Sequence, residues 1–205
     1  MIRPREFFRL ARLGADRSGT VVVEFALVLP VLLILILGSY EAANLLIAYL
    51  KLEAAAETAA DLVSQTPQNT YLQSSGSSNG WDFANISNAV DQVMTPLPTS
   101  SLKIAYASVT FTGTNGAAVI DWHKEVNSAT AITIATLPSS VSAGTLGNAT
   151  QGSTDSFVVV QLTYPYASPI SYILNSTWNL TEAAFNRPRY QNCVPTTMNT
   201  NDVCP

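Results

Sequence analysis

Hydrophobic side chains are concentrated in one run near the N-terminus of the 205-residue chain. The run extends from Thr20 to Leu37, close to the minimum length for a helix that crosses a bilayer. Residues 39–64 continue with strong helix formers and no glycine or proline. Their larger apolar residues recur every three or four positions, in a stripe of Leu45, Leu46, Tyr49, Leu52, Ala56, Ala59 and Val63. We predict one helix over 20–64, with a transmembrane half at 20–38 and an extramembrane half that packs on a head.

The remaining residues, 65–205, have the pattern of a small α+β head. A polar loop from Gln65 to Gly80 precedes a predicted helix over 82–94, whose apolar residues share one face before Pro96. Alternation of apolar and polar residues predicts strands at 101–111, 117–126, 157–164 and 180–186, and a weaker pattern allows another strand at 132–136. We therefore expect an α+β fold with a small antiparallel sheet, and the three tryptophans Trp81, Trp122 and Trp178 in its core or packed on the sheet.

Charge is distributed unequally on the two sides of the apolar run. Acidic residues outnumber basic ones from Thr20 onward. The segment before Gly19 contains two acidic residues and five arginines, Arg3, Arg5, Arg9, Arg12 and Arg17. The positive-inside rule then predicts a cytoplasmic basic leader over 1–19 and an exported head over 65–205. A nucleic-acid partner is not expected, because the head has no basic face to neutralise phosphates.

The two cysteines of the chain, Cys193 and Cys204, lie near its C-terminal end. In an oxidising compartment they would form a short-loop disulfide worth about 3 kcal/mol. Two unpaired thiols on a C-terminal tail are the alternative.

Residues suited to catalysis are few. Gly76, Ser78 and Gly80 satisfy the G-x-S-x-G pattern, but the flanking residues do not predict the strand and helix of a nucleophile elbow. His123 is the only histidine, with Asp121 and Glu125 on the same predicted strand face, and a metal site would need more ligands. We expect no enzymatic activity, no cofactor and no metal; a secreted hydrolase using Ser78 is the weaker alternative.

The N-terminal pattern is specific. Gly19 is followed by TVVVEF, with basic residues before it and an apolar helix after it. This resembles the prepilin signal of type IV pilins, and the longer string GTVVVEFALVLPVLLILILG resembles the TadE-like minor pilins, or pseudopilins, of tight-adherence (Flp-type) pili. VVVQLTYPYASPISYIL and TEAAFNRPR are similar to the end of that family's domain. The resemblance covers both ends of the chain, and the middle is only compatible with it.

The resemblance implies a pilin-like fold and a role for several residues. A prepilin peptidase would cut between Gly19 and Thr20. The carboxylate of Glu24 would then meet the freed amine of a neighbouring subunit, and Phe25 and Pro30 would belong to the same subunit contact. The implied partners are other pilins and pseudopilins, the peptidase, the pilus assembly machinery and membrane lipid. The implied location is the bacterial inner membrane, with a periplasmic head and later entry into an extracellular pilus.

Other interpretations of the same segment remain open. Gly19 could enter an ordinary anchor that is never cut, and the head would then be a periplasmic binding or adhesion module. Glu24 could reach back to lipid headgroups, since it lies only about 6 Å along the helix from Thr20. A secretory signal peptide is the least favoured, because no small-x-small cleavage site follows the apolar run.

Overall fold

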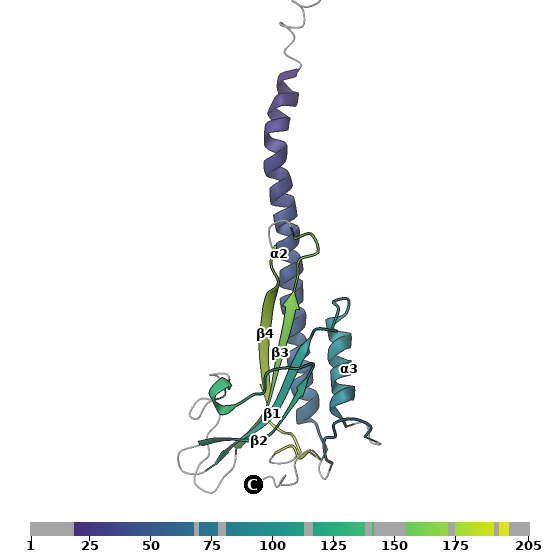
Figure 1. Cartoon of the computed structure of the whole chain (residues 1–205), viewed down its shortest axis with the longest axis vertical. Coiled ribbons are helices and arrows are strands. Elements are labelled where there is room, and N and C mark those ends of the chain that lie inside the picture. The colour runs from purple at the N-terminus through teal and green to yellow at the C-terminus, as the bar shows by residue number, and fades with distance from the viewer. Residues whose placement is uncertain are drawn as a thin grey trace, which may run out of the picture.

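A long helix, α2, stands out from a head of one shorter helix and one sheet (Figure 1). The computed structural model describes residues 19–67, 70–77, 81–112, 117–137, 141, 155–171, 175–190 and 193–196. The predicted α+β class, with a long N-terminal helix and a small antiparallel sheet, is confirmed. The predicted leader before Gly19 lies outside the described residues.

Helix α2 comprises Thr20–Ser64, as the sequence predicts. It is continuous through Pro30, whose missing N–H removes one hydrogen bond of the helix. Its C-terminal carbonyls have partners: the Gln65 N–H donates to Asp61 O, and the Arg189 N–H donates to Ser64 O at 2.9 Å. The second contact ties the end of the helix to the segment that follows the last strand.

Helix α3 comprises Phe83–Met94, one residue shorter than predicted because Asp82 is its N-cap. The Asp82 carboxylate accepts a hydrogen bond from the Asn85 N–H at 2.7 Å. At the other end, Lys51 of α2 donates through Nζ to the carbonyls of Val93 and Thr95, at 3.2 and 2.6 Å. An amine from α2 therefore caps α3 and fixes the two helices together.

The sheet has four antiparallel strands in the order β2-β1-β3-β4. All four strands were predicted, and their bounds are β1 Lys103–Thr112, β2 Ala117–Val126, β3 Asp155–Tyr166 and β4 Trp178–Asn186. Strand β3 continues through Pro165, which lies one residue from its end, so that the prediction of an end at Tyr164 is too short.

The weaker pattern at 132–136 does not form a strand. Ile134–Thr136 is a 3-10 helix, η2. A strand would place Ile132 and Ile134 on one face, whereas Ile132 is buried and Ile134 is exposed. The Thr136 hydroxyl instead accepts from the Thr133 N–H at 2.8 Å and closes a local turn.

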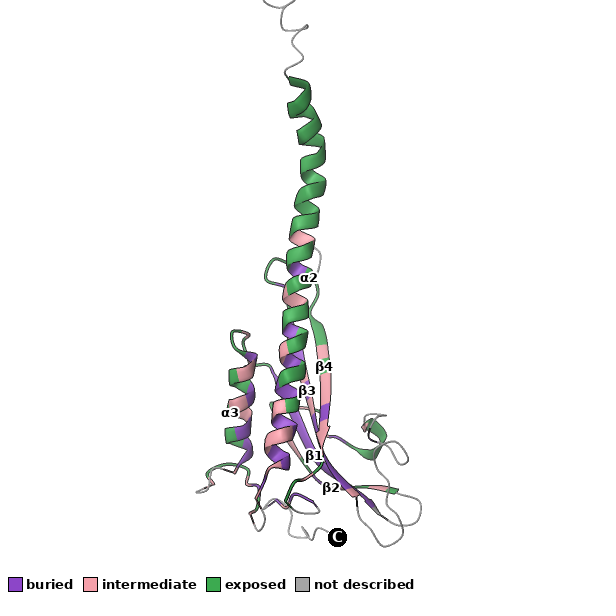
Figure 2. Ribbon diagram, turned by 180° about the vertical axis from the view of Figure 1, so that it is seen from behind, coloured by how far each residue is buried: buried purple, intermediate pink, exposed green. Residues whose placement is uncertain are grey.

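Helix α2 packs on the sheet through small side chains. Its buried residues are Glu41, Ala48, Leu52, Ala55, Ala56, Ala59, Ala60, Val63 and Ser64. The small alanine side chains let β3 and β4 lie close to the helix. The predicted apolar stripe is wrong for Leu46 and Tyr49, which do not face the sheet and are 58% and 40% exposed. Figure 2 shows this change along α2, from a fully exposed first half to a buried face against the sheet.

The head core is built around aromatic contacts between α3 and the sheet. The Phe83 ring lies 5.0 Å from Tyr106 and 5.6 Å from Trp122, measured between centroids. The Trp122 indole N–H donates to Val194 O, which holds the C-terminal segment on the core. Trp81 is partly buried, but Trp178 is 48% exposed at the start of β4, so the expectation of a core position is wrong for that residue.

Enlarging the alanine face should separate α2 from the sheet. Ala59→Leu inserts three carbons at a position with no exposed surface, and we expect a loss of about 1–3 kcal/mol in the free energy of unfolding. Ala54→Leu makes the same change on the exposed face and should be nearly neutral. Urea unfolding of the full chain in detergent, followed by near-ultraviolet circular dichroism, measures both; equal losses would contradict the assigned face.

Stability should also fall at high pH because of Tyr106. Burial raises the pKa of this phenol from 10 to about 12, since ionisation would place a charge in the core. Tyr106 ionises above pH 10 in the unfolded chain but not in the folded protein, so its contribution to the free energy of unfolding should be constant below pH 10. It should then decrease by up to about 3 kcal/mol as the pH approaches 12. Unfolding titrations of the protein and of Tyr106→Phe test this, and an unchanged high-pH slope in the variant would refute it.

Candidate functional site

The first part of α2 is apolar on all sides and touches nothing else in the described chain. Every residue from Gly19 to Ile36 is exposed, including Leu27 with 74% of its surface free. Within the described residues α2 is the one helix long and apolar enough to cross a membrane. A helix with hydrophobic residues all round is stable when lipid or other helices surround it.

Gly19 precedes this helix and occupies the N-cap position. Its backbone is in the right-handed helical region, with φ −76° and ψ −15°, and no side chain caps the helix there. A Cβ added to Gly19 would meet no atom within 4 Å. The fold therefore does not need glycine at this position, and a requirement for it would come from another molecule.

Glu24 lies in the first turns of the exposed segment. It follows Thr20 by four residues, which places the two side chains on the same face of the helix. Glu24 makes no hydrogen bond or ion pair with any described residue, and Phe25 and Pro30 are exposed on the same segment. The residues that the sequence singled out are thus together on one helix and accessible to a partner.

A second carboxylate of α2, Glu41, is buried and was not predicted to be so. It is 1% exposed and lies where the head begins to cover the helix. Burial raises the pKa of the Tyr166 phenol, and the charge of Glu41 raises it further, so the two side chains are close. The spacing of Glu41, Leu45 and Ala48 was a usable signal, since intervals of four and three put Glu41 on the buried face.

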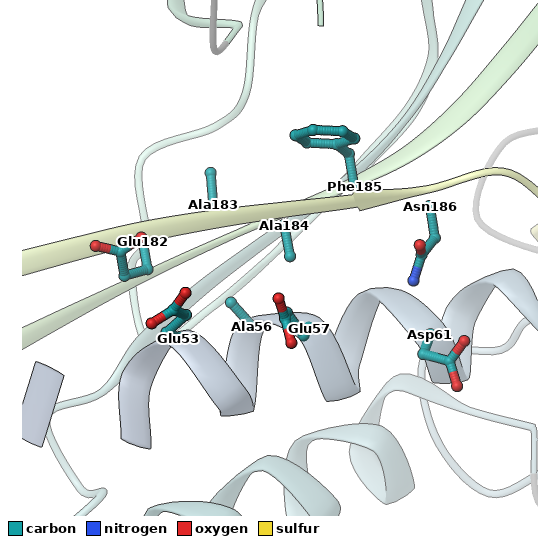
Figure 3. Close-up of a pocket in the computed structure, with 9 residues that line it drawn as sticks. All are labelled: Glu53, Ala56, Glu57, Asp61, Glu182, Ala183, Ala184, Phe185 and Asn186. Atoms are coloured by element: carbon teal, nitrogen blue, oxygen red, sulfur yellow. The ribbon is translucent and has the colours of Figure 1, made fainter. Parts of the chain in front are cut away.

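An acidic cavity of about 490 Å³ lies between α2 and β4 (Figure 3). The lining residues are Glu53, Ala56, Glu57, Asp61, Glu182, Ala183, Ala184, Phe185 and Asn186. Arg189 forms an ion pair with Asp61, and a hydrogen bond with Glu182 raises the pKa of Tyr49. The lining offers carboxylates and an amide but no histidine, cysteine or hydroxyl nucleophile.

His123 is an exposed residue of the edge strand β2. Its Nδ1 lies 2.6 Å from Oε1 of Glu125, as expected for side chains on one strand face. Asp121 does not share that face, because the register shifts between Ser108 and Val109. The Asp121 carboxylate instead accepts from the hydroxyls of Ser108 and Thr110, so the expectation of a common face is wrong for this residue.

The G-x-S-x-G pattern is only partly within the described residues. Ser78 and Gly80 lie outside the described residues, while Gly76 occupies a turn with φ of 75°. No group of His, Cys, Asp and Glu side chains suited to a metal ion occurs in the described ranges.

Cys193 is buried on the head and forms a disulfide. Its predicted partner, Cys204, lies outside the described residues, so the pairing stays a prediction. Near Cys193, Pro195 O accepts from the Leu72 N–H at 2.9 Å. This contact joins the C-terminal segment to the loop before α3, at the end of the head opposite the exposed half of α2 (Figure 1).

Comparison with known proteins gives one family. Residues 19–61 match the family model described as TadE-like protein. The match begins at Gly19, includes Glu24 and ends within the alanine face that packs on the sheet. Searches of curated proteins and of solved structures found no match. Over residues 19–61 the chain therefore resembles TadE-like proteins, and the resemblance predicted from its N-terminal motif is confirmed there.

Proposed function

We propose that the protein is a minor pilin, or pseudopilin, that acts as a structural subunit in the assembly of a tight-adherence type IV pilus. The observation that carries the proposal is the division of α2. Its TadE-like segment combines a fully exposed apolar half that begins at Gly19 with a half that holds the head. The proposed role is structural and not enzymatic.

The topology follows from charge and length. The leader contains five arginines, and the exposed half of α2 is long enough to cross a bilayer once. This supports an anchor in the bacterial inner membrane, with a cytoplasmic N-terminus and a periplasmic head. The same apolar surface could pack among other pilin helices after the subunit leaves the membrane.

Processing between Gly19 and Thr20 is supported by the lack of an internal reason for glycine. Alanine would fit at position 19 and would favour the helical conformation that Gly19 already adopts. A peptidase that needs a bare backbone at the cut site would account for the glycine. The cut would also create an ammonium group at Thr20, one helical turn before Glu24.

Glu24 is the proposed assembly contact. A carboxylate in apolar surroundings is costly, about 2–3 kcal/mol at a helix centre, and an ammonium partner reduces that cost. The new N-terminus of a neighbouring subunit would supply this partner at a fixed position along the helix. The pair would then set the register between neighbouring subunits.

The size of the head bears on position in the filament. The four-stranded sheet and α3 both pack on the outer half of α2, which lies between them in both views (Figures 1 and 2). A head of this size would crowd a thin filament of small pilins. We therefore favour a place at the tip or base, and uniform immunogold labelling along filaments would contradict it.

Gly19→Ala should block processing without disturbing the fold. We expect the leader to remain attached in cells that contain the prepilin peptidase, because the added methyl group faces open space in this chain but would obstruct the peptidase. Intact-mass analysis of the purified protein measures this. Gly38→Ala, the same change within α2 but away from the cut, should be processed normally. An unprocessed wild-type protein would instead favour the uncleaved anchor with a periplasmic binding module.

Glu24→Gln should abolish piliation while membrane insertion and cleavage continue. The amide keeps the size of the side chain and loses the charge that would pair with an ammonium group. Glu53→Gln, on the exposed outer part of the same helix, is the matched control and should leave piliation unchanged. Electron microscopy of cells that carry each variant gives the count of pili, and normal piliation with Glu24→Gln would refute the contact.

A further inference from the structure

The surface of α2 carries no exposed charge over a length greater than the hydrocarbon core of a bilayer. From Phe25 to Leu50 the only residue that carries a charge at neutral pH is Glu41, and the head buries it. At about 1.5 Å per residue this stretch is about 39 Å long, against about 30 Å for the hydrocarbon core. The uncharged surface therefore continues past the membrane into the region where the head begins.

Apolar side chains are exposed at this junction on both the helix and the sheet. We call them the collar: Tyr40 from α2, Ile170 from the segment after β3, and Trp178 from the start of β4. The segment between Asp155 and Glu182 also contains no charged residue. The collar is thus an uncharged surface formed by two separate parts of the chain.

Pairing and electrostatic contacts place the two parts at one level. Trp178 pairs with Tyr166 across β3 and β4. Burial raises the pKa of Tyr166, and electrostatic interaction with Glu41 and Tyr40 of the helix raises it further, so these side chains are close together. Figure 1 shows the ends of β3 and β4 beside α2, at the end of the head that faces the exposed half of the helix.

That level coincides with the outer edge of the membrane. If Thr20 lies at the cytoplasmic edge of the hydrocarbon core, about twenty residues of helix reach Tyr40 at the opposite edge. Tryptophan and tyrosine favour the headgroup region, where an apolar ring and a polar tip are both accommodated. Burial of Glu41 at this depth removes the one carboxylate that would oppose such contact.

We propose that the collar rests in the lipid interface of the outer leaflet of the inner membrane, so that the head lies against the bilayer before the subunit is extracted. This inference rests on the proposed single-pass anchor and adds a second contact with lipid. Lipid fits the collar better than one partner helix would, because the collar is uncharged and combines side chains from the helix and from the sheet. Extraction would then have to remove the collar from lipid as well as the span.

Spin labels on single engineered cysteines in the full chain, reconstituted in vesicles of phosphatidylethanolamine and phosphatidylglycerol, test the proposal. Labels at Trp178→Cys and Ile170→Cys report the collar, and Ile34→Cys reports the span. Val119→Cys is the matched control, because Val119 has a similar exposure, 46%, and lies at the end of β2 beside Thr110, away from the collar. Collisions with oxygen, which enters lipid, are compared with collisions with a water-soluble nickel chelate.

We expect the oxygen-to-nickel ratio at positions 170 and 178 to be severalfold above that at 119 and below that at 34. Ratios at 170 and 178 equal to that at 119 would overturn the collar contact while leaving the anchor in place. Shielding of both labels from both reagents would indicate protein contact and would also overturn it. A water-exposed label at 34 would instead refute the anchor itself. Tyr40→Cys, on the helix side of the collar, repeats the measurement if a variant at 170 or 178 misfolds.

Discussion

The structure depends on one helix that meets two different surroundings along its length. Up to Ile36, α2 is exposed on every side and hydrophobic, which suits lipid or other helices. From Ala48 to Val63, one face is built mainly of alanines, and β3 and β4 lie against it. The position of the sheet follows from the small size of these side chains, since larger ones would hold the strands away.

Charged residues follow the same division. The head begins at Glu41, which it buries, and the first base after the apolar run is Lys51, which caps α3. Farther along, Asp61 pairs with Arg189, and the Arg189 backbone N–H binds the last carbonyl of α2. Lys51 and Asp61 therefore fix the head to the helix beyond the proposed membrane region, where water is available to the rest of their surface.

Local patterns were sufficient to predict most elements but not how they pack. The bounds of α2 and the existence of α3 and four strands follow from long periodic segments. The exposure of Leu46, the orientation of Asp121 and the turn at Thr133–Thr136 were missed. The first two depend on a contact with another segment or on a register shift, which residue spacing within one segment does not report. The turn is closed locally by the Thr136 hydroxyl, which the alternation of apolar residues does not indicate.

The candidate site was more predictable than the packing because it is carried by adjacent residues. Gly19, Thr20 and Glu24 are recognised within six positions, and the structure adds that no described contact constrains them. The role of a residue that stabilises the fold can be recognised from its contacts with other residues of the same chain. Among the described residues Gly19 and Glu24 make no side-chain contact of this kind, and both are locally unfavourable, one for a helix and the other for an apolar span. Their purpose is therefore to be sought in contacts with other molecules, which is the expectation for an assembly signal.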